Sequence, residues 1–203
     1  LHNNNSVNIA IADMNDDPAV GYKKALLDKL YRIHSNNGTP LRNSLKKAGL
    51  YLECASGGYF SSCPASSIAD GGSCQQNFAV LMTDGFYNGG SPSIPNADGD
   101  NNTGFDGGAY GDPRSNTLAD VAMHFYERDL QTGLDDQVPT IPSIDEANHQ
   151  HMVTYGVAFG VVGNLTSMPT DNTTAFAWPN PFSGTTAQRN ANRIDDLRHA
   201  AYN

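Results

Sequence analysis

The sequence predicts an α/β fold in which a mostly parallel sheet is flanked by helices on both faces. Two stretches carry this prediction. Residues 78–82 form an apolar run too short for a helix, which is typical of a strand buried on both faces, and residues 151–160 are rich in β-branched and aromatic residues and end at glycine. Amphipathic helical patterns alternate with these strands, as expected of a parallel sheet.

The first forty residues predict one strand and one helix. The strand covers residues 6–12 and is followed by an acidic turn. Residues 22–34 then repeat apolar side chains at helical spacing, which predicts an amphipathic helix with an inner stripe. The stripe consists of Leu26, Leu27, Leu30 and Ile33.

A second helix is predicted to start at once, with Thr39 as its cap and Pro40 at its first position. Its buried stripe comprises Leu41, Leu45, Ala48 and Leu52. Residues 54–74 then turn to glycine, serine and alanine without periodicity, which indicates an insertion rather than an element.

The second half of the chain predicts two more helices. Thr117 and Asp120 have the spacing of a capping box, and Leu118, Val121, Ala122 and Phe125 form the inner face of a helix that ends near residue 130. Residues 164–190 carry few signals of order. A short helix over residues 195–202 closes the chain.

Composition limits the classes of function. The 203 residues suit one domain, and a mean hydropathy of -0.46 predicts a water-soluble protein without a membrane span. The net charge of -9 argues against nucleic acid, because phosphate binding needs a basic face. An acidic surface suits divalent cations, although a secreted acidic surface without a bound ion explains it equally well.

The cysteines and the first residues indicate an exported protein of greater length. Cys54, Cys63 and Cys74 all belong to the Gly/Ser-rich insertion, as in a loop cross-linked in an oxidising compartment. The sequence leaves their pairing open. Leu1 is not an initiator methionine, and the residues after it do not resemble a signal peptide, so we expect the chain to be a piece of something longer.

Asp84 is the first candidate for a functional residue. It lies in the turn Thr83-Asp84-Gly85, which terminates the apolar run at residues 78–82. In an open α/β sheet the ligand site lies outside the carboxyl ends of the strands, so a carboxylate there faces a crevice. The alternative is a turn residue that hydrogen-bonds its own backbone.

The long loop at residues 89–113 holds a second candidate. Side-chain oxygens alternate through Asp98, Asp100, Asn102 and Asp106, which resembles the start of a calcium loop, but the glycine is displaced to Gly104 and no glutamate closes the loop. A solvated Asn/Asp/Gly loop is favoured. His149 and His151 are a weaker metal candidate, and surface or packing roles are favoured for both.

A helix that begins Gly-Thr-Pro-Leu, followed by a strand that ends Thr-Asp-Gly, resembles a von Willebrand factor A domain. That family holds a divalent ion with an Asp-x-Ser-x-Ser turn, a threonine and a later aspartate, and the resemblance places Thr39 and Asp84 in the last two roles. The Asp-x-Ser-x-Ser element does not occur in the sequence. The resemblance therefore implies a domain without its first strand, with Mg²⁺ or Ca²⁺ as the expected cofactor.

Four blocks extend the resemblance: CQQNFAVLMTDGFYN, SNTLADVAMHFYERDL, HQHMVTYGVAFGVVG and RIDDLRHAAYN. In this order they resemble the N-terminal A-type domain of the PilC/PilY family, adhesins of type IV pilus tips. The family's C-terminal β-propeller is not represented. The resemblance implies a non-enzymatic adhesion and pilus-assembly module outside the cell or at the pilus tip. Its implied partners are minor pilins, a host or surface receptor and the rest of the same adhesin.

Two other functions remain open. One is a divalent-metal hydrolase that uses Asp84 with Asp98 or Asp100, although the sequence has no G-x-S-x-G, H-E-x-x-H or phosphate-binding glycine motif. The other is a structural spacer of the pilus tip.

Overall fold

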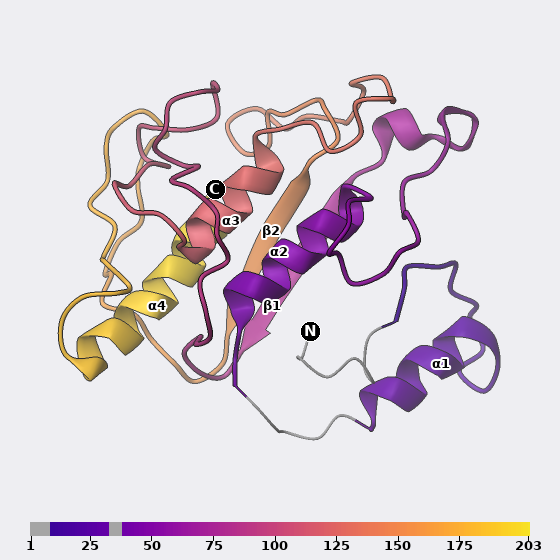
Figure 1. The fold of residues 1–203 in the computed structure, drawn as a ribbon, viewed down its shortest axis with the longest axis horizontal. Coiled ribbons are helices and arrows are strands. Elements are labelled where there is room, and N and C mark those ends of the chain that lie inside the picture. Colours follow the sequence, from indigo (N-terminus) through magenta and orange to yellow (C-terminus); the bar gives the residue numbers. More distant parts are fainter. Residues whose placement is uncertain (1–8, 33–37) are drawn as a thin grey trace.

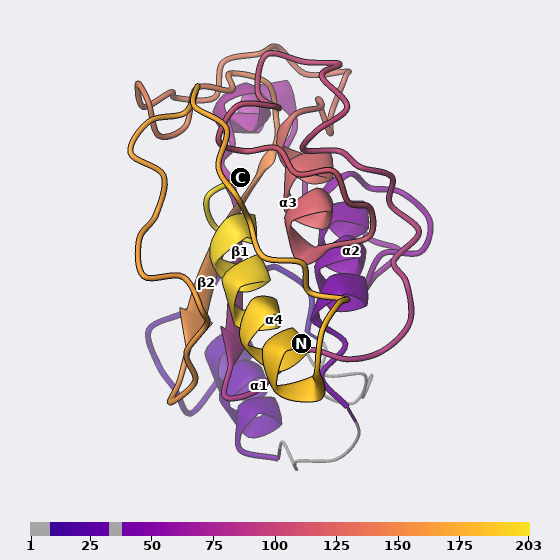
Figure 2. The ribbon, with the colours of Figure 1, turned by 90° about the vertical axis from the view of Figure 1, so that its left-hand side faces the viewer.

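The structure is a computed structural model that describes residues 9–32 and 38–203. Its elements follow in the order α1 (Gly21–Leu30), α2 (Leu41–Leu52), β1 (Asn77–Thr83), α3 (Leu118–Tyr126), β2 (Met152–Ala158) and α4 (Thr186–Ala200). Figures 1 and 2 show α2, α3 and α4 lying against one side of the two strands, and Figure 1 shows α1 apart from these helices. The class is therefore α/β, as predicted.

The sheet of the described chain consists of β1 and β2, which run parallel with Asn77 opposite Met152 and Thr83 opposite Ala158. Its inner face is covered, because Leu81 and Met152 lie in one core cluster with residues of α2, α3 and α4. Its outer face is not: Phe78, Val80 and Met82 are 52%, 58% and 60% exposed. The prediction that residues 78–82 are buried on both faces, with helices on both sides, is thus wrong for the described residues.

Helix α3 forms the centre of the core. Its capping box is present as predicted: Thr117 Oγ1 accepts a hydrogen bond from the Asp120 amide, and the Asp120 carboxylate accepts one from the Thr117 amide. The predicted inner face is confirmed, since Leu118, Val121, Ala122 and Phe125 are all at most 1% exposed. The helix ends at Tyr126, four residues before the predicted end.

Close packing between α2 and α3 explains a glycine inside α2. A Cβ at Gly49 would overlap the ring of Phe125, so only glycine lets the helices approach this closely. Leu45 and Leu52 of the predicted stripe are buried, and Leu41 and Ala48 pack at its margin.

Of the N-terminal predictions, the helix is confirmed as α1, but the strand and the buried stripe are not found where the structure describes them. Residues 9–12 form no strand, and residues 6–8 lie outside the described chain. Helix α1 has no buried residue, and Leu30 is 53% exposed, so the predicted stripe is not covered. Ile33 lies outside the described residues.

The last helix is longer than predicted. A second capping box starts α4, with Thr185 Oγ1 accepting from the Gln188 amide and Gln188 Oε1 from the Thr185 amide. Helix α4 thus begins at Thr186, inside a stretch in which we expected little order.

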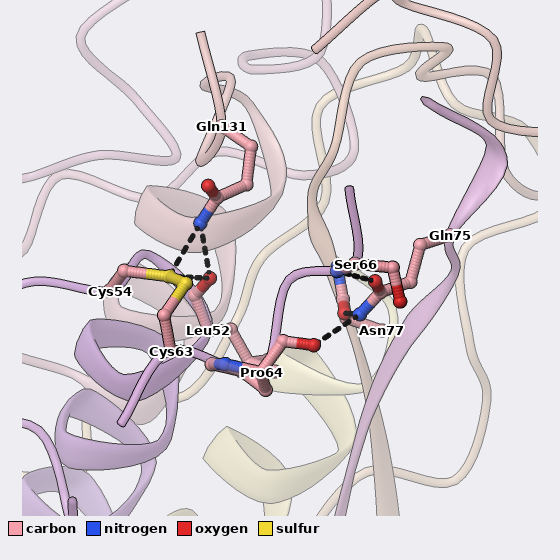
Figure 3. The surroundings of a disulfide bond; sticks show 8 residues. All are labelled: Leu52, Cys54, Cys63, Pro64, Ser66, Gln75, Asn77 and Gln131. Atoms are coloured by element: carbon pink, nitrogen blue, oxygen red, sulfur yellow. Dashed lines mark hydrogen bonds between the residues drawn. A yellow bond between two sulfur atoms is a disulfide. The ribbon is translucent and has the colours of Figure 1, made fainter. Parts of the chain in front are cut away.

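The insertion at residues 54–74 is anchored at both ends (Figure 3). A disulfide joins Cys54 to Cys63, and Cys74 is free and exposed. At the far end, Gln75 Oε1 accepts a hydrogen bond from the Ser66 amide at 2.8 Å. The insertion contains two 3₁₀ turns, Ile68–Asp70 and Gly72–Cys74, and it forms no α-helix or strand.

Candidate functional site

The turn after β1 presents Asp84 to solvent. Its geometry is set by Thr83, whose hydroxyl accepts from the Gly85 amide at 3.2 Å and donates to the Gly85 carbonyl at 2.9 Å. The Asp84 side chain is exposed and makes no hydrogen bond or ion pair to any described residue. The turn therefore does not depend on the Asp84 carboxylate for its hydrogen bonds.

Thr39 lies beside the same turn but does not cap the helix. Helix α2 begins at Leu41 after Pro40, and no side chain caps it, so the predicted capping role of Thr39 is wrong. Instead, the Thr39 amide donates to Asn88 Oδ1 at 2.9 Å, and the Asn88 amide donates to the Thr39 carbonyl at 2.8 Å. These bonds tie Thr39 to the loop that starts at Asp84.

The loop at residues 89–113 forms no helix or strand, as predicted, but it is not a solvated loop. Ile94, Ala97, Asp98 and Ala109 are at most 4% exposed. Trp178 Nε1 donates to the Ala109 carbonyl at 2.8 Å and helps to fix this part of the loop. The loop is therefore packed into the protein along much of its length.

Asp98 points into the core rather than toward an ion site. Its Oδ1 accepts from the Asp112 amide at 3.1 Å, and its Oδ2 lies 3.2 Å from Asn203 Nδ2 and 3.4 Å from His199 Nε2. Burial, reinforced by the negative charge of Asp120, raises the pKa of Asp98 to about 9. At neutral pH this carboxyl group is therefore protonated, and it serves the packing of the loop on α4.

Three other carboxylates converge. Asp100, Asp106 and Glu127 each offer an oxygen within 4.8 Å of the other two, and they are the one such group of three found among the described residues. We call them the acidic triad. Asn102 positions the two carboxylates that belong to the loop. The Asn102 backbone amide donates to Asp106 Oδ2 at 3.0 Å, and Asn102 Nδ2 donates to Asp100 Oδ2 at 2.9 Å. Two predicted loop residues thus come together here with a glutamate from the end of α3.

Burial and mutual repulsion raise the pKa values of two carboxyl groups of the triad. Burial, followed by the charges of Asp100 and Asp106, raises the pKa of Glu127 to about 7. Burial also raises the pKa of Asp106, with a contribution from Asp100 that is opposed by amide hydrogen bonds. A bound divalent ion would relieve this repulsion, and hard cations prefer carboxylate oxygens.

No local pattern in the sequence indicates Glu127 as a metal ligand. Calcium loops place their closing glutamate a fixed few residues along the same loop, whereas Glu127 lies at the C-terminal cap of α3. Only the packing of loop 89–113 against α3, where Thr103 Oγ1 lies 3.3 Å from Glu127 Oε2, brings it to the site.

The paired histidines are not free to bind a metal. His151 is buried, with Nδ1 2.7 Å from the His149 carbonyl and Nε2 3.0 Å from Asp145 Oδ1. His149 Nε2 lies 2.8 Å from the Tyr126 carbonyl. Both side chains therefore serve packing and hydrogen bonding, the roles that the sequence favoured.

The carboxylates of the hydrolase hypothesis have different surroundings. Asp84 is exposed, Asp98 is fully buried, and Asp100 belongs to the acidic triad. No described group of three metal-binding side chains includes Asp84 together with either of the others.

Comparison with known proteins identifies the family. The chain is 32% identical, over 207 aligned residues, to the type IV pilus biogenesis factor PilY1 of Pseudomonas aeruginosa strain PAK, and 31% identical to PilY1 of strain PAO1. Each alignment covers 86% of this chain. The chain belongs to the PilC/PilY family. PilY1 of strain UCBPP-PA14 is 28% identical over 83% of the chain.

These 203 residues span only 17% of the length of each PilY1 relative. No protein-family model matches this PilC/PilY chain, and no solved structure matches it. Within the described residues, no helix is both long and apolar enough to cross a bilayer.

Proposed function

We propose that this chain acts in type IV pilus biogenesis and surface adhesion as a non-catalytic, partner-binding module of a PilC/PilY protein. The observation that carries the proposal is the similarity to PilY1, a named pilus biogenesis factor, over 86% of the chain. The proposed partners are minor pilins or the pilus tip, a host or surface receptor and the remainder of the same protein.

The proposed location is outside the cell, on its surface or at the pilus tip. The Cys54–Cys63 disulfide supports this location, because disulfides persist in oxidising compartments. The acidic net charge of -9 supports recognition of proteins or cations rather than of nucleic acid.

We further propose that the module binds a divalent cation at the acidic triad and uses it to order loop 89–113 for partner binding. Support comes from the proximity of three carboxylates and from the exposure of Asp100, which leaves one side open to water or to a partner's oxygen. Calcium takes six to eight oxygens in flexible geometry, and the amide-bonded loop fits it better than the strict octahedron of magnesium.

The strand-end site fits a metal less well in this chain. Thr39 and Asp84 lie on adjoining segments, but two side-chain oxygens are too few to displace most of the water shell of a hard cation. Within these residues, Thr39 and Asp84 therefore supply at most a partial set of metal ligands.

The test uses the intact protein in a piliated bacterium. The double variant Asp100→Asn/Asp106→Asn removes two charges of the triad, and Asp136→Asn is the control because Asp136 is an exposed aspartate outside the triad. Exported protein, surface pili and adhesion are measured with calcium and with a chelator.

We expect the double variant to be exported normally. In calcium, its adhesion or its number of surface pili should fall to the level that wild type shows in the chelator. The control should behave as wild type. Unchanged adhesion and piliation in the double variant would contradict a role of the triad and favour a structural spacer.

A further inference from the structure

The loop between α3 and β2 carries an exposed apolar turn at its tip. Ile144 is 79% exposed and Ile141 is 50% exposed, although isoleucine is among the residues most often found fully buried. The Val138 amide donates to the Asn148 carbonyl at 2.9 Å, so the loop doubles back on itself and places the two isoleucines at its far end. We call residues 141–145 the isoleucine turn.

Hydrogen bonds give the isoleucine turn one fixed shape. The Ile141 amide donates to the Asp145 carbonyl at 2.6 Å, and the Asp145 amide donates to the Ile141 carbonyl at 2.8 Å. Ser143 has a positive φ of 62°, which is unfavourable for a residue with a side chain, and its amide donates to Glu146 Oε1 at 2.9 Å. The turn therefore keeps Ile144 in solvent at a conformational cost.

The base of the isoleucine turn is tied to the core. The Glu146 amide donates to the Tyr126 hydroxyl at 3.1 Å, and this hydroxyl donates to Asp145 Oδ1 at 3.2 Å. Asp145 is buried, and its Oδ1 also lies 3.0 Å from His151 Nε2. The centre of the Tyr126 ring lies 5.5 Å from that of Phe105, which belongs to the loop of the acidic triad. One aromatic side chain thus supports both the isoleucine turn and the triad loop.

The loop that carries the turn is acidic. Residues 129–188 contain no lysine or arginine. Glu146, directly after the turn, is exposed and forms no ion pair with a described residue. Asp100 of the acidic triad, in the loop that packs on Tyr126, is exposed as well. A partner that covers the isoleucine turn therefore meets uncompensated negative charge and must bring positive charge to it.

We propose that the isoleucine turn is the contact through which this module binds a partner protein, at an apolar pocket bordered by lysine or arginine side chains. The inference rests on the proposed function, in which the chain is a partner-binding module, and it assigns the contact and the chemistry of the partner. Ile141 and Ile144 would enter the pocket, and the Glu146 carboxylate would face the basic side chains at its margin. A turn that is already fixed loses little conformational entropy on binding.

Charge argues against two other occupants. Segments that lie on a membrane combine apolar side chains with lysine or arginine, and the loop of the isoleucine turn has neither of these basic residues. A second copy of the chain would bring a further net charge of -9 and the same acidic loop. A basic partner protein is the occupant that complements both the apolar and the charged groups.

Site-specific photo-crosslinking tests this contact with the intact protein in a piliated bacterium. A photoreactive phenylalanine analogue replaces Ile144, and in the control it replaces Tyr31, which is 81% exposed. Tyr31 directly follows α1, which Figure 1 shows apart from the other helices. Glu146→Gln is combined with the analogue at position 144, because glutamine keeps an Oε1 acceptor for the Ser143 amide and removes the charge.

We expect the analogue at position 144, and not at position 31, to cross-link to a second protein at an apolar site bordered by lysine or arginine. Glu146→Gln should lower the yield of this product by about threefold at low salt, because an exposed ion pair contributes modestly. High salt should remove that difference. A product with lipid, with another copy of the chain or with the remainder of the same protein would overturn the proposal. Equal products at both positions, or no product, would overturn it as well.

The double variant Ile141→Ser/Ile144→Ser connects the contact to function. Both side chains are exposed, so the variant should be exported and should melt as wild type does. Adhesion or surface pili should fall at least about tenfold, because a few anchors carry most of the energy of an interface. Tyr31→Ser, a change at a similarly exposed site, should behave as wild type.

A strain that lacks the whole protein separates this inference from the proposed function. Wild-type piliation and adhesion in the double variant, where the deletion strain has lost them, would overturn the isoleucine turn as the contact and leave the proposed function intact. Unchanged piliation and adhesion in the deletion strain would overturn both.

Discussion

Asp98 and Asp100 are two residues apart in one loop and have opposite environments. Asp98 is fully buried and accepts a hydrogen bond from the Asp112 amide. Asp100 is exposed and lies within 4.8 Å of carboxylate oxygens of Asp106 and Glu127. Asp98 holds the loop to the core, and Asp100 is the exposed member of the acidic triad.

The difference shows that alternating oxygens in a sequence need not face one ion. In an extended segment residues i and i+2 share a side, but this loop turns at Gly99. A Cβ on Gly99 would come 2.5 Å from the Asp112 carbonyl oxygen, so the chain passes there at a distance that only glycine allows. The turn separates Asp98 from the residues that follow.

The largest expected effect is a loss of folding stability when the side chain of Asp98, the buried residue of the two, is truncated. Asp98→Ala leaves the buried Asp112 amide without its acceptor and should lower the free energy of unfolding by about 2–3 kcal/mol. Asp100→Ala, at an exposed site, should change it by less than about 0.5 kcal/mol. Urea denaturation measures both, and equal losses would contradict the contrast.

A second prediction concerns pH. The pKa of Asp98 is about 9 in the folded protein and about 3.9 in an unfolded chain, so between these values the folded state holds the extra proton. Stability should therefore fall as pH rises from 7 to 9, with a slope of up to about 1.4 kcal/mol per pH unit. Asp120 and His199, with pKa values of about 7 and about 4, titrate mainly below this window.

Asp98→Asn sharpens the pH prediction, because asparagine mimics a carboxyl group that carries a proton. This variant should remove most of the slope between pH 7 and 9 and cost less stability than Asp98→Ala. Denaturation midpoints across the pH range provide the measurement. A wild-type slope that persists in Asp98→Asn would assign the proton to another group.

The third prediction concerns calcium binding at the acidic triad. If calcium binds the triad, calcium at about 100 times its Kd should raise the free energy of unfolding of wild type by about 2.7 kcal/mol. Asp106→Asn should lose this gain while keeping its stability in chelator. A gain that survives in Asp106→Asn would place the ion elsewhere.

The smallest expected effect is at Asp84. Because Asp84 belongs to no described group of three metal-binding side chains, Asp84→Asn should leave calcium affinity of this chain within about twofold, less than the tenfold that corresponds to 1.4 kcal/mol. Titration calorimetry compares the two proteins. A tenfold loss would move the cation site to the strand end.

Local signals predicted much of the fold. Thr117 and Asp120 fixed the start of α3, and the apolar runs located β1 and β2 within two residues of their bounds. The start of α4 was missed although Thr185 and Gln188 have capping-box spacing, because the apolar periodicity in that stretch is weak.

The candidate site was less predictable because it depends on tertiary packing. The loop sequence indicated Asp100 and Asp106, but nothing local distinguishes them from Asp98 or connects them to Glu127. The exposed outer face of β1 also departs from the prediction. An apolar run indicates that a strand is suited to burial on both faces, but it does not show which part of the protein covers each face.

Calorimetric titration of calcium into wild type, Asp98→Asn and Asp100→Asn/Asp106→Asn most directly tests the division of this loop into a structural and a cation-binding part. We expect one calcium site in wild type, the same site in Asp98→Asn, and none in the double variant. Absence of binding in folded wild-type protein, or a site that is lost in folded Asp98→Asn and retained in the double variant, would contradict it.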